Sequence, residues 1–218
     1  MCSNEQFSGN ILIANYDKII FKKSCGYANR NFNVKNNLQT KFNLGSIGKI
    51  FTSISIAQLI EKNKLSLDEE IYKIIPSWLP NEADKKITVE QLLTHAAGLG
   101  NFMDDKRWKL GADSALYITV NDYKPLILDD KRLFKPGESQ RYSNDGYIVL
   151  GTIIESLSNE DYFDYVKKNI FNVAQMNNTG IWRLDDPIFN RAEGYFSVCS
   201  SRKCQWKNNN FEAPFGGL

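Results

Sequence analysis

The stretch from Ser46 to Asn63 constrains the fold more than any other part of this 218-residue sequence. Its apolar residues recur at steps of three and four, the period of one face of an α-helix. They are Ile47, Ile50, Phe51, Ile54, Ala57 and Ile60. The stripe is broad and carries few charges, so we expect a largely buried helix over 46–63. The chain must therefore supply other elements that cover this helix.

Residues 9–29 predict a β-hairpin that precedes this helix. The segments GNILIA and KIIFKKSCGYA are rich in branched residues, and Asn15-Tyr16-Asp17 between them favours a turn. Lys22 and Lys23 indicate that part of the second strand faces solvent or forms an edge of the sheet.

The residues after 63 predict a mainly helical region. Thr88 and Gln91 form a capping box at the start of one helix, which Gly98 can stop. Apolar residues at helical spacing predict two more helices over 145–157 and 161–171. A hairpin, a buried helix and a mainly helical region together indicate an α+β fold.

We expect one domain over residues 1–218. Its parts are a hairpin and central helix over 7–65, a mainly helical region over 66–185, and an irregular return segment over 186–218. The net charge of +2 does not favour nucleic acid as a partner. No apolar stretch is long enough for a transmembrane segment.

The residues at the start of the chain leave its compartment open. Residues 7–14 are a short apolar stretch preceded by Glu5 rather than by a basic cluster, so no export signal is visible. We therefore expect a cytoplasmic protein, or a periplasmic or secreted one if a signal peptide has been removed.

The cysteines do not form a metal-binding pattern. Cys199 and Cys204 are spaced C-x4-C without a second pair, and Cys2 and Cys25 lie far away. A zinc site is therefore disfavoured, and we expect neither a metal nor a cofactor. We expect free thiols, with a local disulfide between Cys199 and Cys204 as the alternative in an oxidising compartment.

His95 is the only histidine, so it alone could serve a Ser-His-Asp triad. It follows the apolar residues of LLTHAAGL, and a histidine in that position is more often a structural hydrogen-bonding residue than a base. The sequence also has no G-x-S-x-G turn. A serine enzyme built from this chain would need another proton acceptor.

Ser46 and Lys49 supply such a pair as S-x-x-K at the start of the central helix. This spacing places the hydroxyl and the amine on neighbouring turns of one face. The helix N-terminus favours alkoxide character in the serine and the neutral form of the lysine. A buried lysine that loses its proton can act as a base. The motif recurs as Ser200-Ser201-Arg202-Lys203 in a polar segment, so context rather than spacing favours Ser46.

Tyr142-Ser143-Asn144 is the second element that could carry chemistry. It lies between the turn Lys135-Pro136-Gly137 and the helix over 145–157. Tyr142 can relay a proton beside a cation, and Asn144 can accept from Lys49 and donate to a substrate carbonyl. The structural alternative is a packed tyrosine followed by a helix cap. Tyr27-Ala28-Asn29 has the same spacing at the end of the hairpin.

These motifs occur in an order that resembles the β-lactamase-related serine hydrolases. This family includes class C β-lactamases, DD-peptidases of the penicillin-binding type and related esterases. The resemblance covers nearly the whole chain. It is carried in order by FSGNILIA, GYANR, TKFNLGSIGKIFTSISIAQLIEKNKLSLDEEI, ITVEQLLTHAAGL, FKPGESQRYSNDGYIVLGTIIE and FGGL.

The resemblance implies a role for each residue. Ser46 would attack a carbonyl and become acylated, Lys49 would accept or shuttle its proton, and Tyr142 would serve as the second acid or base. Asn144 would orient the substrate and Lys49, and the Ser46 main-chain N–H would supply half of an oxyanion hole. The implied substrates are β-lactams, D-amino-acid peptides or small esters, and the implied fold is β-lactamase/transpeptidase-like.

One part of the family pattern is absent from the sequence. The family carries a K-T-G or H-x-G triplet on a strand near its C-terminus, and neither triplet occurs here. The K-x-G of Lys135-Pro136-Gly137 belongs to the turn before Tyr142. We therefore expect a chain truncated after FGGL, with C-terminal strands missing and an exposed sheet edge through which it could associate. The alternative function is an inactive family member or a binding module. A third hypothesis is a plain α+β interaction domain in which the motifs occur by coincidence.

Overall fold

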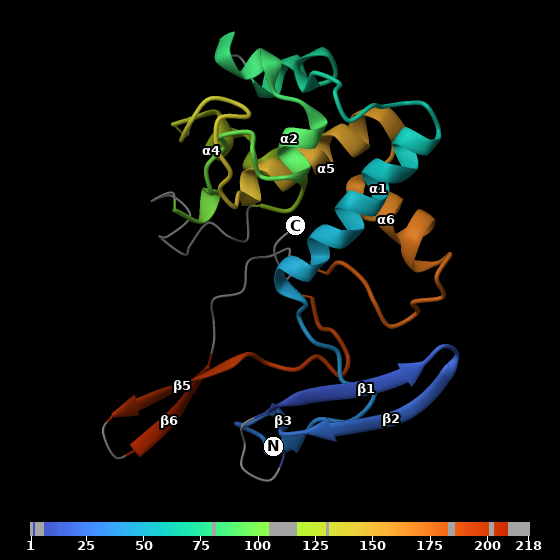
Figure 1. Ribbon diagram of the computed structural model, residues 1–218. Coiled ribbons are helices and arrows are strands. Elements are labelled where there is room, and N and C mark those ends of the chain that lie inside the picture. The colour runs from blue at the N-terminus through green and yellow to red at the C-terminus, as the bar shows by residue number, and fades with distance from the viewer. Residues whose placement is uncertain are drawn as a thin grey trace. The chain divides into compact units, whose positions relative to one another are not determined.

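The computed structural model describes residues 2, 7–79, 82–104, 117–129, 131–182, 186–200 and 203–208. For residues 83, 199, 200, 203, 204 and 208 it describes the main chain only. The described residues form two compact units, which Figure 1 shows in one view. The first unit comprises residues up to Leu44 and from Asp186 onward, and the second comprises 45–182.

The described residues of the first unit form three two-stranded antiparallel sheets. Its strands are β1 Gly9–Asn15, β2 Lys18–Cys25, β3 Tyr27–Asn29, β4 Val34–Lys35, β5 Tyr195–Ser200 and β6 Lys203–Asn208. The β1–β2 register runs from Gly9 opposite Cys25 to Asn15 opposite Lys18, which confirms the predicted hairpin. Tyr16 takes a left-handed conformation at the turn, with φ of 49°.

The return segment after Asp186 joins the first unit through main-chain hydrogen bonds. Lys41 N donates to Asn190 O at 2.8 Å, and Ala192 N donates to Lys41 O at 2.9 Å. Glu193 N donates to Ala28 O at 2.8 Å. The β5–β6 hairpin is tied to this unit by Arg30, whose guanidinium carbon lies 3.9 Å from the Trp206 ring centroid. A cation at that distance is attracted to the face of the indole ring.

Two predictions for this unit were wrong. The segment from 186 onward was expected to be irregular, but β5 and β6 pair in it. Cys2 and Cys25 were expected to be free thiols, but they form a disulfide. Cys199 lies opposite Cys204 in the β5–β6 register. Their side chains lie outside the described atoms, so the predicted bond between them stays a prediction.

The second unit is helical in its described residues. Its α-helices are α1 Lys49–Glu61, α2 Val89–Leu93, α4 Lys124–Leu128, α5 Asn144–Ser158 and α6 Tyr162–Val166. Its single-turn 3₁₀ elements are η2 Gly45–Gly48, η3 Ile71–Lys73, η4 Pro76–Trp78, η5 Glu82–Lys86, η6 Phe102–Asp104 and η8 Val120–Tyr123. A π-helical turn, η9 Lys167–Phe171, continues α6.

Helix α5 lies at the centre of this unit, and its residues 144–154 are all buried (Figure 1). Ile148, Val149, Leu150, Ile153 and Ile154 join one apolar core with residues of α1, α2, α4 and α6. The predicted capping box at Thr88 and Gln91 is present at the start of α2. That helix ends at Leu93 rather than near Gly98, because His95 already takes the left-handed conformation, with φ of 60°.

Helix α1 buries a different face from the one that we predicted. Ile47 and Ile50 of the apolar stripe are 56% and 55% exposed. The buried face instead carries Lys49, Thr52, Ser55, Ile56 and Leu59. The polar residues on this face are satisfied by hydrogen bonds, since Thr52 Oγ1 lies 2.8 Å from Tyr162 Oη and Ser55 Oγ donates to Phe51 O at 2.8 Å. Buried polar groups with such partners do not carry the desolvation cost of unpaired ones.

The β1–β2 hairpin exposes apolar side chains. They are Leu12, Ile13, Ile19, Ile20 and Phe21. Association through this sheet edge stays a prediction. None of the described helices is both long and apolar enough to cross a membrane.

A buried ion pair gives a test of this fold. Asp84 is fully buried and accepts two hydrogen bonds from Arg132, at 2.9 and 2.8 Å. We expect Asp84→Ala to lower the free energy of unfolding by about 3 kcal/mol, because it removes the buried carboxylate that accepts two hydrogen bonds from the largely buried Arg132. Urea unfolding followed by circular dichroism measures this. Lys73→Ala removes an exposed pair with Glu70 and should change little; equal losses in both variants would contradict the argument.

Candidate active site

Ser46 and Lys49 lie on consecutive elements of the second unit. Ser46 is in the 3₁₀ turn η2, which begins at Gly45 with φ of 52°, and Lys49 is the first residue of α1. The predicted α-helix therefore starts three residues later than Ser46. The Ser46 side chain is exposed to solvent, whereas Lys49 is only 6% exposed. A hydroxyl that a substrate can reach is thus followed one turn later by an amine removed from water.

Tyr142 is hydrogen-bonded to Ser46. Its Oη donates to Ser46 Oγ at 2.6 Å, across 96 residues of sequence. Tyr142 precedes α5 in an extended segment, and Ser143 caps that helix by accepting from Gly146 N at 3.0 Å. The cap keeps Tyr142 outside the helix, so that its side chain can extend to η2.

Asn144 is hydrogen-bonded to Lys49. Lys49 Nζ donates to Asn144 Oδ1 at 2.7 Å, in a buried contact between α1 and α5. Burial lowers the pKa of Lys49 from its ordinary value, while a hydrogen bond and charge interaction with Tyr142 act in the opposite direction. Burial has this effect because the ammonium form loses more hydration than the neutral amine.

Asn101 orients the amide of Asn144, and the sequence contained no signal for it. Asn144 Nδ2 donates to Asn101 Oδ1 at 3.0 Å and to Met103 Sδ at 3.4 Å. With its nitrogen engaged there, Asn144 presents its oxygen to Lys49. Asn101 follows a Gly-Leu-Gly segment and belongs to no recognisable motif, so only the fold brings it to the site.

His95 holds the main chain on both sides of Tyr142. Its carbonyl oxygen accepts from Arg141 N at 3.0 Å, and its Nδ1 accepts from Ser143 N at 3.2 Å. Its ring lies 4.7 Å from that of Tyr142, between ring centroids. The structural role expected for this histidine matches these contacts. Burial and the charge of Lys49 lower its pKa.

The residues that follow α2 also hydrogen-bond to the loop that precedes Tyr142. Gln140 Nε2 donates to Thr94 O at 2.7 Å, and Gly137 N donates to Ala96 O at 2.8 Å. Gly98 passes close to this loop with φ of 76°, and a Cβ on it would lie 2.1 Å from Phe134 O. Only glycine fits this approach without a shift of the main chain.

The structure thus brings all four predicted site residues together as two bonded pairs, Ser46 with Tyr142 and Lys49 with Asn144. The other copies of the two motifs are in the first unit. Tyr27 and Asn29 lie in β3, and Ser200 and Lys203 lie at the ends of β5 and β6, where their side chains are outside the described atoms. Within the described part of the chain, no group of three or more His, Cys, Asp and Glu residues could hold a metal ion.

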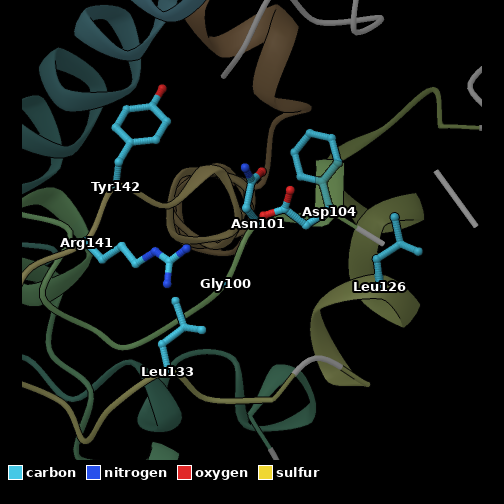
Figure 2. Close-up of a pocket in the computed structure, with 8 residues that line it drawn as sticks. Gly100, Asn101, Asp104, Leu126, Leu133, Arg141 and Tyr142 are labelled. Atoms are coloured by element: carbon cyan, nitrogen blue, oxygen red, sulfur yellow. The ribbon is translucent and has the colours of Figure 1, made fainter. Parts of the chain in front are cut away.

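A hollow of about 240 Å³ lies beside Tyr142. Figure 2 shows the side chains of Arg141 and Asp104 entering it from different sides, with Leu133 and Leu126 as apolar lining. Asn101 lies between these two charged residues in that view. The hollow therefore borders the site through Tyr142 and through the Asn101–Asn144 contact.

Comparisons with known proteins agree with this geometry. The sequence profile of the beta-lactamase family matches residues 6–204. The chain belongs to the beta-lactamase family. The family resemblance predicted from the motifs is therefore confirmed, and so is the β-lactamase/transpeptidase-like fold with helices and antiparallel sheets.

Three relatives of the beta-lactamase-family chain illustrate the range of similarity. Penicillin-binding protein 4* of Bacillus subtilis (strain 168) is 32% identical over 180 residues, which cover 81% of this chain and 38% of that protein. The structure of a penicillin binding protein from Bacillus halodurans matches with a TM-score of 0.85 and 28% identity, over 99% of this chain and 66% of that one. D-amino acid amidase from Ochrobactrum anthropi SV3 shares the fold, with a TM-score of 0.71 and 23% identity over 87% of this chain and 51% of that one.

The family assignment and the relation to penicillin-binding proteins support the serine hydrolase class. The chain spans well under half the length of the curated relative and about two thirds of the Bacillus halodurans chain.

The single histidine gives a test of the contacts around Tyr142. The pKa of folded His95 lies below the ordinary value of about 6.5, so the unfolded chain takes up its proton at higher pH. Stability therefore falls as pH falls through about 6.5 toward the lowered pKa. We expect the loss of unfolding free energy between about pH 7.5 and 5.5 to be smaller in His95→Gln than in the wild type. Urea unfolding at both values measures this; equal losses would show that folded His95 titrates like the unfolded residue.

Proposed function

We propose that the site is that of a serine hydrolase, which cleaves amides or esters through an acyl-enzyme on Ser46. The observation that carries the proposal is the 2.6 Å hydrogen bond between Tyr142 Oη and the exposed Ser46 Oγ, beside a buried lysine. An activated nucleophile needs a neighbouring group that can take its proton. Tyr142 is in position to do so, and Lys49 interacts with Tyr142 in turn.

Acylation would begin with the proton of Tyr142. In the structure Tyr142 donates to Ser46, so Tyr142 first gives its proton to neutral Lys49, which leaves the phenol oxygen as an acceptor. As Ser46 Oγ then forms a bond to the carbonyl carbon of the substrate, the proton of Ser46 passes to Tyr142 Oη. The resulting ammonium on Lys49 donates a hydrogen bond to Asn144 Oδ1, which lies 2.7 Å from Lys49 Nζ in the structure. Collapse of the tetrahedral intermediate breaks the bond to the leaving group, and the proton returns along the same route to that group. Water then hydrolyses the ester on Ser46 by the reverse sequence.

The neutral form of Lys49 is what this route requires. The burial that lowers its pKa makes the neutral amine accessible nearer to physiological pH than in an exposed lysine. We propose that the Ser46 N–H donates to the developing oxyanion, since it lies in the turn η2 that precedes α1.

The substrates that the family resemblance implies are β-lactams, D-amino-acid peptides and small esters. The relation to a penicillin-binding protein of Bacillus subtilis and the fold shared with a D-amino acid amidase support this set. The family profile crosses both units, which supports the proposal that residues 1–218 belong to one domain.

The alternative is a chain that binds acyl compounds without turning them over, or that has no activity. Neither K-T-G nor H-x-G, one of which the family resemblance implies, occurs in these 218 residues. Loss of one oxyanion donor typically lowers kcat by about two to three orders of magnitude.

Covalent labelling tests the nucleophile. We expect one adduct in the intact mass of the chain after incubation with a fluorophosphonate and, separately, with a penicillin, because Ser46 is exposed and activated. Ser46→Ala should give no adduct, whereas Ser53→Ala should still react. Ser53 is a matched control, since it lies on α1 and, among the described residues, its side chain hydrogen-bonds only to Tyr147 Oη, at 3.4 Å. Labelling of Ser46→Ala would exclude Ser46 as the nucleophile.

The proton route predicts a dependence on Tyr142 and on pH. We expect Tyr142→Phe to lower the rate of labelling by roughly 100-fold, the usual contribution of a positioned acid or base. In the wild type the rate should rise with pH as Lys49 loses its proton, and Lys49→Arg should remove that rise because arginine stays protonated. Stopped-time mass spectrometry between pH 6 and pH 10 measures both. A Tyr142→Phe variant that labels at the wild-type rate would rule out the relay.

A further inference from the structure

The hollow beside Tyr142 has no part in the acylation steps, yet it carries charged groups. Arg141 immediately precedes the residue that contacts Ser46, and Figure 2 shows its guanidinium directed into the hollow near Gly100. Its main chain is held by the bond from Arg141 N to His95 O. Among the residues that the structure describes, no carboxylate forms an ion pair with Arg141.

Asn101 adds a second donor on this wall. Its Oδ1 already accepts from Asn144 Nδ2 at 3.0 Å and from Met103 N at 3.3 Å. These two contacts fix which end of the amide is the acceptor, so Nδ2 remains a donor. Figure 2 shows this nitrogen on the Tyr142 side of Asn101, above the guanidinium of Arg141 in that view. Both residues line the hollow, so it has two donor groups for a ligand that offers oxygen acceptors.

We propose that this hollow binds the acyl portion of the substrate, and that this portion ends in a free carboxylate bonded by Arg141 and Asn101. The inference rests on the proposed function, since it takes Ser46 as the acylated residue. A planar guanidinium matches a carboxylate through two parallel hydrogen bonds, which a neutral ester cannot reproduce. Leu126 and Leu133 supply apolar surface for the chain that joins the carboxylate to the reacting carbonyl.

The size of the hollow fits this assignment. Its volume of about 240 Å³ is below the range of roughly 300 to 1,000 Å³ that is usual for whole small-molecule ligands. It therefore suits one arm of a substrate, such as a short dicarboxylic acyl chain, with the leaving group outside.

Asp104 lines the opposite side and supplies an internal test. Its carboxylate opposes an anionic ligand and weakens the attraction of Arg141. Removal of each charge should therefore change the preference for a carboxylate in opposite directions.

Two matched esters test the proposal by acylation. In p-nitrophenyl adipate the second carboxyl is free, and in p-nitrophenyl methyl adipate it is methylated. The measured quantity is the ratio of their acylation rates, from p-nitrophenolate release and intact mass. We expect Arg141→Gln to lower the ratio of free acid to methyl ester by about tenfold. Asp104→Asn should raise it, and Lys168→Gln, which removes a distant exposed cation, should leave the ratio unchanged.

Equilibrium binding to Ser46→Ala separates this inference from the proposed function. Monomethyl adipate and dimethyl adipate are titrated into this variant by NMR, with and without Arg141→Gln. If monomethyl adipate binds more tightly than dimethyl adipate, and Arg141→Gln abolishes this difference, the carboxylate site is supported. This holds even if neither p-nitrophenyl ester acylates Ser46, a result that would reject the proposed function but not the carboxylate site. Equal binding of the two ligands, or a preference that survives Arg141→Gln, overturns the inference whatever the acylation assay shows.

Discussion

The removal of one lysine amine from water is the constraint on which the rest of the site depends. Lys49 lies at the first turn of α1 and is buried against α5, so its nitrogen needs a partner within the protein. Asn144 supplies that partner, and Asn101 holds Asn144 in the required orientation. This series of contacts joins three segments that are distant in sequence. These hydrogen bonds therefore help to fix how α1, α5 and the segment just before η6 meet.

Exposure changes sharply over a short distance in this site. The serine hydroxyl lies at the surface, the tyrosine is half exposed with its hydroxyl on the serine, and the lysine is enclosed. In the proposed mechanism a substrate carbonyl can therefore approach Ser46 directly, while Lys49, the proposed proton acceptor, is shielded from water. The 3₁₀ turn before α1 contributes to this difference, because it places Ser46 outside the regular helix. The same turn explains why the α-helix does not begin at Ser46, as the sequence predicted, but at Lys49.

The elements with strong local signals were predictable, and contacts between distant segments were not. The capping box at Thr88, the hairpin over β1 and β2, and the helix that became α5 all follow from side chains close in sequence. The four candidate site residues were proposed from motif order, although nothing local indicated that Tyr142 would contact Ser46. The buried face of α1 was misassigned because hydrophobic spacing cannot show that Thr52 and Lys49 have partners on α5 and α6. Asn101, the Cys2–Cys25 bond and the β5–β6 hairpin likewise depend on what the fold brings together.

The bond from the Ser143 amide to His95 also determines where the proton of that imidazole resides. Since a main-chain N–H can only donate, Nδ1 must be unprotonated, and the neutral ring carries its hydrogen on Nε2. The chain has no other imidazole, so its nitrogen NMR spectrum contains one pair of ring resonances. That pair is a spectroscopic reporter of the loop that carries the tyrosine. A change of tautomer would signal that the loop has left its position, even when Ser46 has not reacted and no labelling reagent is present.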